Sequence, residues 1–505
     1  MKILTAEQIA EADAYTIENE PIKSIDLMER ASKACFEWLV ANFDKSNDFY
    51  VFCGVGNNGG DGLAIARLLT EKGYRVNVVI VAFSDKTSPD YSTNLQRFKK
   101  LNPGAITTLT ESDHKFSFDM EDAVVIDAIF GSGLNRTVSG FAGDVIRKIN
   151  EADLEVVSVD IPSGLFVQNN KDNNPNGIIR AGITLSLELP KLSFLFADNQ
   201  EFVGEWVIVP IGLDHDFIEQ QQSVNRYFLK EDVEGLIGSR ASFSHKGTFG
   251  HALLAGGSRG MMGAAVLMTQ GCLRSGVGLA TTVVPRCGYN IIQEAVPETL
   301  CITLKEMDIL SGSLDTDNYN AFGVGPGIGT HRRTVSWFSR VLENIKVPMV
   351  VDADAINILA QNKALIDLLP EDTILTPHPG EFDRLVGKSE SGHIRMEKAV
   401  EFAVRHNTCV ILKGRHTAIA TPEGEAHFNS SGNSGMATGG SGDVLTGLIT
   451  GLLAQGYPPL SACIIGAFIH GRAGDIKSQE GSEQSLIAGD IVNGIGQAFR
   501  QTLEP

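Results

Sequence analysis

Residues 437–456 read ATGGSGDVLTGLITGLLAQG, a glycine-rich turn that leads directly into an apolar stretch. Apolar residues at 444, 445, 448, 449, 452 and 453 repeat with helical spacing, and Gly456 followed by two prolines predicts where the helix ends. The N–H groups of such a turn and the helix N-terminus point at one spot, which favours an anion. We therefore expect a phosphate to approach the backbone here.

Asp443 ends the glycine turn, at a place where its charge opposes a bound phosphate. The residue is suited there to accept a proton from an attacking hydroxyl while phosphate is transferred to that hydroxyl. The alternative is that Asp443 only stabilises the helix N-terminus. A helix dipole contributes about 0.3–1 kcal/mol toward an anion, so several N–H bonds and Mg²⁺ are expected to supplement it.

Short apolar runs rich in Val and Ile alternate with helical segments along most of the 505 residues. This pattern predicts α/β domains with parallel sheets covered by helices on both faces. A polar, strand-poor stretch over residues 214–239 predicts a linker between domains at 1–213 and 240–505. The expected strands lie in DFYVFCG, YRVNVVIV, DAVVIDAIFG and LEVVSVDIPSG in the first half, and in HALLAGG, VGLATTVVP, AFGVGPG, VPMVVDADA, DTILTPHPG and CVILKG in the second.

The composition limits the partners of the chain. With 42 basic and 61 acidic residues the net charge is −19, which argues against a nucleic-acid or membrane-surface binder. The seven cysteines are scattered without a CxxC pair, so neither a zinc site nor a disulfide framework is expected. No apolar stretch approaches the ~20 residues that cross a bilayer, and no signal-peptide core is present, so we expect a cytoplasmic protein.

A second glycine turn follows the first expected strand and reads GVGNNGGDG over residues 54–62. Its spacing satisfies G-x-G-x-x-G, but the acid that closes the next strand of a dinucleotide site is missing, so we reject that interpretation. Two further strands end in Asp127 and in Asp160 with Ser163. Because such strand ends meet at one edge of a parallel sheet, we expect these groups to converge with Asn58, unless that amide only caps the helix.

NNGGDG, DAIFGSGLNRTVSG, VDIPSG and the Pro-Lys pair ending at Lys191 together resemble the N-terminal YjeF-type domain, the NAD(P)H-hydrate epimerase, over about residues 1–213. The resemblance implies a Rossmann-like three-layer αβα domain. It implies a potassium site formed by Asn58, Asp127 and Ser163, whose oxygen ligands suit a hard, weakly held cation. The strand before Lys191 departs from the family's Thr-rich pattern and leaves the role of that lysine open. The substrate pocket implied is lined by Asn57, Asn58, Gly59, Gly60, Asp61, Gly131, Ser132, Gly133, Leu134, Asn135, Arg136, Thr137 and Asp160.

GGSGD resembles the anion hole and catalytic base of ribokinase-type kinases, and no Walker A string occurs. Together with HKGTFGHALLAGGSRGMMGAAVL, GVGPGIG, VVDADAIN, LTPHPGEFDRL and ILKGRHTAI it looks like the C-terminal YjeF-type domain, the nucleotide-dependent NAD(P)H-hydrate dehydratase, over about residues 240–500. The resemblance implies a ribokinase-like α/β fold. It places the nucleotide at Lys413, Gly414, Arg415, His416, Thr417 and Gly442, and the hydrated cofactor at Ala264, Gly327, His378 and Asp443.

Structural alternatives accompany three of these residues: His378 as a fixed turn, Gly327 as turn geometry and Ala264 as helix packing. The function implied is repair of hydrated NADH and NADPH. In the first domain the ring nitrogen expels the hydroxyl and water returns from either face, with Asp160 as both acid and base. In the second the S hydrate is phosphorylated and phosphate is eliminated, with ADP and Mg²⁺, or ATP as the alternative donor.

Two rival functions were weighed against this one. A ribokinase-group kinase of vitamin precursors would keep GGSGD but yield a stable phosphorylated alcohol, and a non-catalytic scaffold would only bind a nucleotide. Intact Asp160 and Asp443 argue against the scaffold. The partners we expect are the small molecules NADHX, NADPHX and ADP, together with further copies of the chain in a homo-oligomer, a tetramer or larger.

Overall fold

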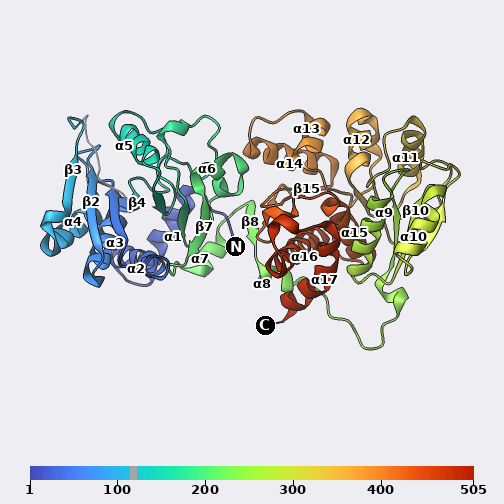
Figure 1. Ribbon diagram of the computed structural model, residues 1–505, viewed down its shortest axis with the longest axis horizontal. Coiled ribbons are helices and arrows are strands. Elements are labelled where there is room, and N and C mark those ends of the chain that lie inside the picture. The colour runs from blue at the N-terminus through green and yellow to red at the C-terminus, as the bar shows by residue number, and fades with distance from the viewer. Residues whose placement is uncertain (114–121, 505) are drawn as a thin grey trace. The chain divides into compact units, whose positions relative to one another are not determined.

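The computed structural model describes residues 1–113 and 122–504. The chain forms two compact units, Met1–Ser223 and Val224–Pro505 (Figure 1). Residues 214–239, which we expected to form a linker, divide between them. The short helix α7 (His215–Gln220) stacks Phe217 on Tyr15 in the first unit, with ring centroids 4.3 Å apart. The strand β8 (Asn225–Phe228) pairs with β17 (Ala426–Asn429) in the second, because Tyr227 and Phe228 are apolar residues that require burial.

The first unit contains a seven-stranded sheet in the order β3-β2-β1-β4-β5-β6-β7, and every pairing in it is parallel. The chain leaves β1 toward β2 and β3 and then crosses to β4, so the order of strands reverses between β1 and β4. The strands are β1 (Asp48–Cys53), β2 (Arg75–Val81), β3 (Ile106–Leu109), β4 (Val124–Ala128), β5 (Glu155–Val159), β6 (Ile183–Leu187) and β7 (Glu205–Val209). A reversal of this kind creates a crevice at the carboxyl ends of the two strands.

Helices cover both faces of this sheet, as the alternating pattern predicted. One apolar cluster joins the strands to α2, α3 and α4, and a second joins the opposite face to α5. The unit is therefore a three-layer αβα domain. Its helices are α1 (Ala6–Asn19), α2 (Ser24–Asn42), α3 (Asn57–Lys72), α4 (Pro89–Leu101), α5 (Gly140–Glu151), α6 (Gln200–Val203) and α7.

The second unit contains a ten-stranded sheet in the order β11-β10-β9-β12-β13-β14-β15-β16-β17-β8. All its pairings are parallel except those of β16 with β15 and with β17. The strands besides β8 and β17 are β9 (His251–Ala255), β10 (Leu279–Val284), β11 (Leu300–Thr303), β12 (Ala321–Val324), β13 (Met349–Val351), β14 (Ile374–Leu375), β15 (Cys409–Leu412) and β16 (Ala418–Ala420).

The helix expected after the glycine turn is α15 (Ser441–Ala454), and Gly456 beyond its end is left-handed with φ +89°. Every residue from 444 to 454 is buried, because α15 contacts α9 and α16 as well as the sheet (Figure 1). The helices of this unit are α8 (Lys230–Glu234), α9 (Met262–Arg274), α10 (Tyr289–Ala295), α11 (Arg332–Asn344), α12 (Ala353–Gln361), α13 (Pro379–Val386), α14 (Gly392–His406), α15, α16 (Pro459–Glu480) and α17 (Ala488–Leu503). Among the described residues, no helix has both the length and the apolar character that a membrane span requires.

Candidate functional sites

The glycine turn after β1 lies in the crevice of the first unit. A Cβ atom on Gly54 would lie 2.0 Å from the carbonyl oxygen of Ile129, which follows β4. The turn therefore needs glycine so that the two strand ends can approach. It leads into α3, whose N-cap is Gly56 and makes no side-chain cap bond, so neither Asn57 nor Asn58 is the capping residue.

The side chain of Asn58 is buried, yet neither its Oδ1 nor its Nδ2 has a hydrogen-bond partner among the described residues. A buried amide left unpaired costs about 1–3 kcal/mol. Gly131 lies beside it, because a Cβ atom on Gly131 would be 3.2 Å from Asn58 Cβ and 3.3 Å from Asp160 Oδ2. Both polar atoms of this side chain are therefore available to a ligand.

The end of β4 places Asp127 in a dense set of hydrogen bonds. Its carboxylate accepts from the Ser163 N–H at 2.8 Å, the Ser163 hydroxyl at 2.5 Å and the Ser158 hydroxyl at 2.8 Å. Burial raises the pKa of Asp127, and the hydrogen bonds from Ser163 and Ser158 oppose that effect. The expected ligands Asp127 and Ser163 are thus in direct contact.

Asp160 follows β5 in a left-handed conformation with φ +71°, which a residue other than glycine adopts at a cost of about 1–3 kcal/mol. Its Oδ1 lies 2.8 Å from Nζ of Lys191, and its Oδ2 accepts the Ser132 N–H at 2.9 Å. Lys191 is fully buried and also donates to the Ser186 hydroxyl and to the carbonyls of Leu187 and Leu189. The side chain whose role the sequence left open is therefore the cationic partner of Asp160.

The loop that follows β4 divides into two parts. Gly131 and Ser132 lie against Asn58 and Asp160, whereas the other residues expected to line the pocket extend toward solvent, with only Leu134 half-buried. The exposed members are Gly133, Asn135, Arg136 and Thr137. Of residues 131–137, therefore, only Gly131 and Ser132 lie at the carboxyl ends of the strands.

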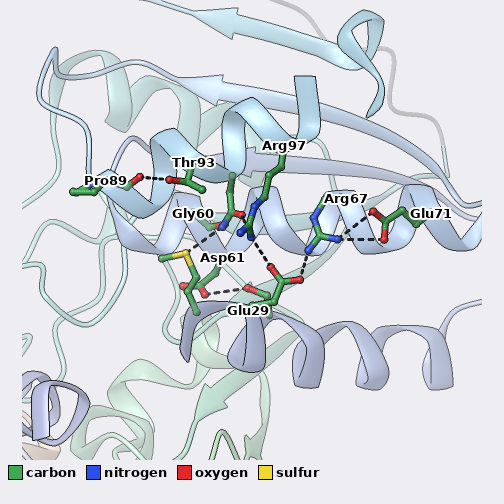
Figure 2. A network of polar contacts seen from close by, with 11 residues as sticks. Glu29, Gly60, Asp61, Arg67, Glu71, Pro89, Thr93 and Arg97 are labelled. Atoms are coloured by element: carbon green, nitrogen blue, oxygen red, sulfur yellow. Dashed lines mark hydrogen bonds and ion pairs between the residues drawn. The ribbon is translucent and has the colours of Figure 1, made fainter. Parts of the chain in front are cut away.

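Two further carboxyl groups adjoin the Asp160–Lys191 pair. Asp61, within the expected pocket, is buried in α3 and accepts from the Ser32 hydroxyl at 3.1 Å (Figure 2). Burial raises its pKa well above the usual range. Asp13 on α1 was missed by sequence reasoning, and burial, with Asp160 second, raises its pKa to about 6. Ala12 and Thr16 beside it are buried, so this face of α1 packs inward, which the local sequence did not show.

In the second unit, α15 begins at the glycine turn with Gly440 in a left-handed conformation of φ +91°. Asp443 is the third residue of this helix and is partly buried. Burial first, and then the nearby Asp352, raises the pKa of Asp443 to about 7, while Lys413 lowers it. A carboxyl group with this pKa can exchange a proton near neutral pH.

The environment of Asp443 is organised by Asp352, a residue that the sequence analysis did not select. Asp352 directly follows β13 and is 1% exposed. Its Oδ1 lies 2.8 Å from Nζ of Lys413, and its Oδ2 accepts the Thr446 hydroxyl at 2.7 Å. A Cβ atom on Gly442 would lie 3.0 Å from the same Nζ, so the lysine points at the glycine turn. Ligands of parallel sheets bind beyond the carboxyl ends of the strands, and Asp352 is the first polar residue after the strand in VVDADAIN. That rule would have selected it.

The residues expected beside the hydrated cofactor have structural roles as well. A Cβ atom on Gly327, whose φ is +65°, would lie 2.8 Å from the Met261 carbonyl and 3.2 Å from the Ala264 Cβ. His378 is the N-cap of α13: its Nδ1 accepts the Gly380 N–H at 3.1 Å, and its own N–H donates to Glu381. Half of the His378 side chain nevertheless remains exposed.

The expected nucleotide loop, residues 413–417, follows β15. Its Arg415 donates to the Gly432 carbonyl at 2.6 Å, and the Thr417 hydroxyl donates to the Gly414 carbonyl at 3.0 Å. Burial lowers the pKa of His416 to about 4, so its ring is neutral. The loop is thereby tied to the segment that leads into the glycine turn.

His470 on α16 is a supporting residue that sequence reasoning also missed. Burial lowers its pKa to about 4, and the ring lies against the start of α15. Because the imidazole is neutral, the 2.9 Å contact between its Nε2 and the Ser441 carbonyl requires the proton on Nε2. The histidine therefore holds the first turn of α15 through a hydrogen bond to the Ser441 carbonyl.

Both units thus carry strand-end sites typical of α/β enzymes, and the second has an acid at a glycine-lined helix N-terminus. A family model described as NAD(P)H-hydrate dehydratase matches residues 252–495, and one described as YjeF-related protein N-terminus matches residues 24–193. The chain is 34% identical over 522 residues to the bifunctional NAD(P)H-hydrate repair enzyme Nnr of Moorella thermoacetica, covering 100% of this chain and 98% of the relative. It is 31% identical to the enzyme of that name from Escherichia coli, covering 92% and 88%.

Solved structures resemble the second unit. A ribokinase-like superfamily protein from Enterococcus faecalis is 25% identical, with a TM-score of 0.50, over 56% of this chain and 99% of that chain. An ADP/ATP-dependent NAD(P)H-hydrate dehydratase from Bacillus subtilis, co-crystallised with ATP and Mg²⁺, is 29% identical with a TM-score of 0.47, over 55% and 98%. The chain belongs to the family of bifunctional NAD(P)H-hydrate repair enzymes and contains both the epimerase and the dehydratase domain.

Proposed function

We propose that the second unit removes water from the S hydrate of NADH or NADPH by phosphorylating its hydroxyl group with ADP. Asp443 takes the hydroxyl proton as the oxygen attacks the terminal phosphorus, and AMP leaves. The lone pair of the ring nitrogen then expels phosphate, and loss of a ring proton restores the dihydronicotinamide. The observation that carries this proposal is the position of the partly buried Asp443 in the first turn of α15, directly after the glycine turn, with a pKa that burial and Asp352 raise to about 7.

The lysine at the glycine turn supports a phosphate at the same place. Lys413 is held by Asp352 and points at Gly442, so its ammonium group and the N–H groups of the turn can share one anion. The nucleotide then extends over Lys413, Gly414, Arg415, His416 and Thr417. Ala264, Gly327 and His378 are the residues we assign to the hydrated cofactor.

Mg²⁺ fits this site as a companion of the phosphates. Among residues 1–113 and 122–504, no group of three or more His, Cys, Asp or Glu side chains is arranged to hold a metal ion unaided. Mg²⁺ usually binds through substrate phosphates and one or two carboxylates, and Asp352 or Asp354 would serve here. When bound, the ion would neutralise phosphate charge, while Asp443 handles the proton.

For the first unit we propose epimerisation of the R and S hydrates at the crevice between β1, β4 and β5. Asp160 is the proton-handling group, because its carboxyl group lies at the end of β5 in contact with Lys191 and the Ser132 N–H. The ring nitrogen expels hydroxide, and water returns to the iminium carbon from the other face. The R hydrate then becomes available to the dehydratase.

A potassium ion in this crevice would take Asn58, Asp127 and Ser163 as ligands. The unpaired Oδ1 of Asn58 fits an oxygen-liganded cation, whereas both carboxylate oxygens of Asp127 already accept hydrogen bonds. Bound there, the ion would supply positive charge at the substrate pocket. Epimerisation should therefore rise when potassium replaces a bulky organic cation at constant ionic strength, and Asn58→Leu should abolish that rise.

Homo-oligomerisation is a further part of the proposal. The edge strand β11, the neighbouring α10 and the segment after β11 expose apolar side chains that a partner copy would cover, namely Tyr289, Ile291, Leu300, Ile302 and Met307. Light scattering of Leu300→Lys should show a smaller particle than the unchanged chain.

The dehydratase proposal is tested by stoichiometry. With S hydrate, ADP and Mg²⁺, one phosphate and one AMP should appear for each dihydronicotinamide recovered. A stable phosphorylated product in place of free phosphate would instead make the second unit a kinase.

A further inference from the structure

Asp61 is a buried acid on α3, three residues after Asn58, and it interacts electrostatically with Asp160. It lies on α3 and faces α2, where the Ser32 hydroxyl donates to its Oδ1 at 3.1 Å. Figure 2 shows the contacts that fix these helices: Glu29 on α2 binds Arg67 on α3 and Arg97 on α4. The position of Asp61 relative to Ser32 is therefore set by the packing of three helices.

The charges around Asp61 do not balance if every carboxyl group is ionised. Lys191 is the cation of the cluster, whereas Asp160, Asp61 and Asp13 are three acids that influence one another. Burying one unpaired carboxylate is costly, and burying two beside one ammonium is more costly still. At least one of these acids must hold a proton at neutral pH.

The partners of each acid decide which one is protonated. Asp160 pairs with the ammonium of Lys191 at 2.8 Å and accepts the N–H of Ser132 at 2.9 Å. Asp61 is buried, with 8% of its surface exposed, and among the described residues its carboxyl group accepts a hydrogen bond from the Ser32 hydroxyl and pairs with no cation. Among the described residues, the other ionisable groups that interact with Asp61 or this cluster are acids and thiols: Asp13 from α1, Cys35 from α2, Cys53 from β1, Asp90 from α4, Asp127 from β4 and Glu188 after β6.

We propose that Asp61 holds a proton in the resting crevice and is the acid that complements the Asp160 carboxylate in epimerisation. The inference rests on the epimerase function proposed above and replaces the expectation that Asp160 acts alone. Two carboxyl groups whose environments separate their protonation states are a common arrangement for paired acid and base roles.

The two groups account for every atom of the exchange. The lone pair of the ring nitrogen forms a C=N bond, the C–O bond breaks, and Asp61 gives its proton to the departing hydroxide, which leaves as water. A water molecule then forms a new C–O bond on the opposite face, the C=N electrons return to nitrogen, and Asp160 takes the proton released. Proton exchange with solvent water then returns Asp160 to its carboxylate form and Asp61 to its protonated form before the next turnover, and conversion in the reverse direction exchanges the two roles.

The test compares Asp61→Asn with Ser32→Ala in the full chain. A preparation enriched in R hydrate is incubated without nucleotide, and the R and S forms are separated by chromatography between pH 6 and 10 after subtraction of the uncatalysed rate. Asp61→Asn preserves shape and neutrality but cannot transfer a proton, so kcat/KM should fall about 100-fold or more. Dehydration of S hydrate by the same sample shows that the chain has folded.

Ser32→Ala tests the acid role through the pH dependence of the epimerisation rate. A purely structural role of Asp61 would leave that pH dependence unchanged. The hydrogen bond from Ser32 lowers the pKa of Asp61, so its loss raises that pKa further. An acid acts below its pKa, and the alkaline limb of the rate profile should therefore move to higher pH while the plateau stays within about threefold. Full epimerase activity in Asp61→Asn, or an unmoved limb in Ser32→Ala, would overturn the inference. If the unchanged chain did not epimerise at all, the proposed epimerase function would fail instead.

Discussion

Nζ of Lys413 lies 2.8 Å from Oδ1 of Asp352, and this ion pair faces the glycine turn that begins α15. The pair links the loop after β15 to the end of β13, two strands separated in the sheet by β14. Both groups act on Asp443: the Asp352 carboxylate raises its pKa and the Lys413 ammonium lowers it. Lys413 is therefore a cation available to a phosphate at the turn.

The pH dependence of dehydration should report the ionisation of Asp443. A base must be deprotonated, and burial raises the pKa of this carboxyl group to about 7. The rate at saturating nucleotide should therefore rise with pH, reach half its maximum near pH 7 and level off above it. Asp352→Asn removes a charge that raises this pKa, so the rising limb should move to lower pH. An unmoved limb would mean that another group is titrating.

Substitution of Gly442 should weaken nucleotide binding. In Gly442→Ala the new Cβ atom would lie 3.0 Å from Nζ of Lys413 and would displace the lysine from the turn. Gly489→Ala is a matched control, because Gly489 is likewise the second residue of a helix and its Cβ atom would meet nothing within 4 Å. Calorimetric titration with ADP should show weaker binding in Gly442→Ala alone. Equal affinity in the two variants would contradict this placement of Lys413.

Removing the charge of Lys191 should destabilise the first unit as well as inactivate it. Lys191→Met leaves Asp160 as a buried carboxylate without its cation, which costs about 3–5 kcal/mol. The double variant Lys191→Met with Asp160→Asn should recover much of that stability without recovering epimerisation. Denaturant unfolding followed by fluorescence would measure both effects. A single variant as stable as the unchanged chain would show that the ion pair is not formed.

The two activities should be separable by single substitutions. Asp443→Asn should lose dehydration by about 10²–10⁴-fold yet still epimerise, whereas Asp160→Ala should show the reverse. Assays of each purified hydrate by each variant would test this. Loss of both activities from one substitution in a folded protein would contradict two independent sites.

Much of this architecture was predictable, because its signals are local. The helical spacing of apolar residues after GGSGD predicted α15 and its end near Gly456. Asp127 and Asp160 were selected because each stands at the carboxyl end of an expected strand. The rest depends on contacts between distant segments. Neither the pairing of Lys191 with Asp160 nor the proximity of Asp13 to them follows from spacing along the chain.

Two further differences arise from packing. The antiparallel strand β16 (Ala418–Ala420) is three residues long, too short to leave a clear apolar pattern. The polar stretch 214–239 was interpreted as a linker because its few apolar residues are scattered, although Phe217 and Phe228 each fasten part of it to a unit. The polarity of the stretch did not show that Phe217 packs on Tyr15 or that Phe228 belongs to a strand paired with β17.

The most direct test of the account is recovery of dihydronicotinamide absorbance from an equal mixture of R and S hydrates of NADH, with ADP, Mg²⁺ and potassium present. If both sites work as proposed, essentially all the absorbance should return, at a rate well above the uncatalysed epimerisation. Recovery that stops at half would contradict the epimerase site around Asp160, and no recovery with either ADP or ATP would contradict the dehydratase site around Asp443.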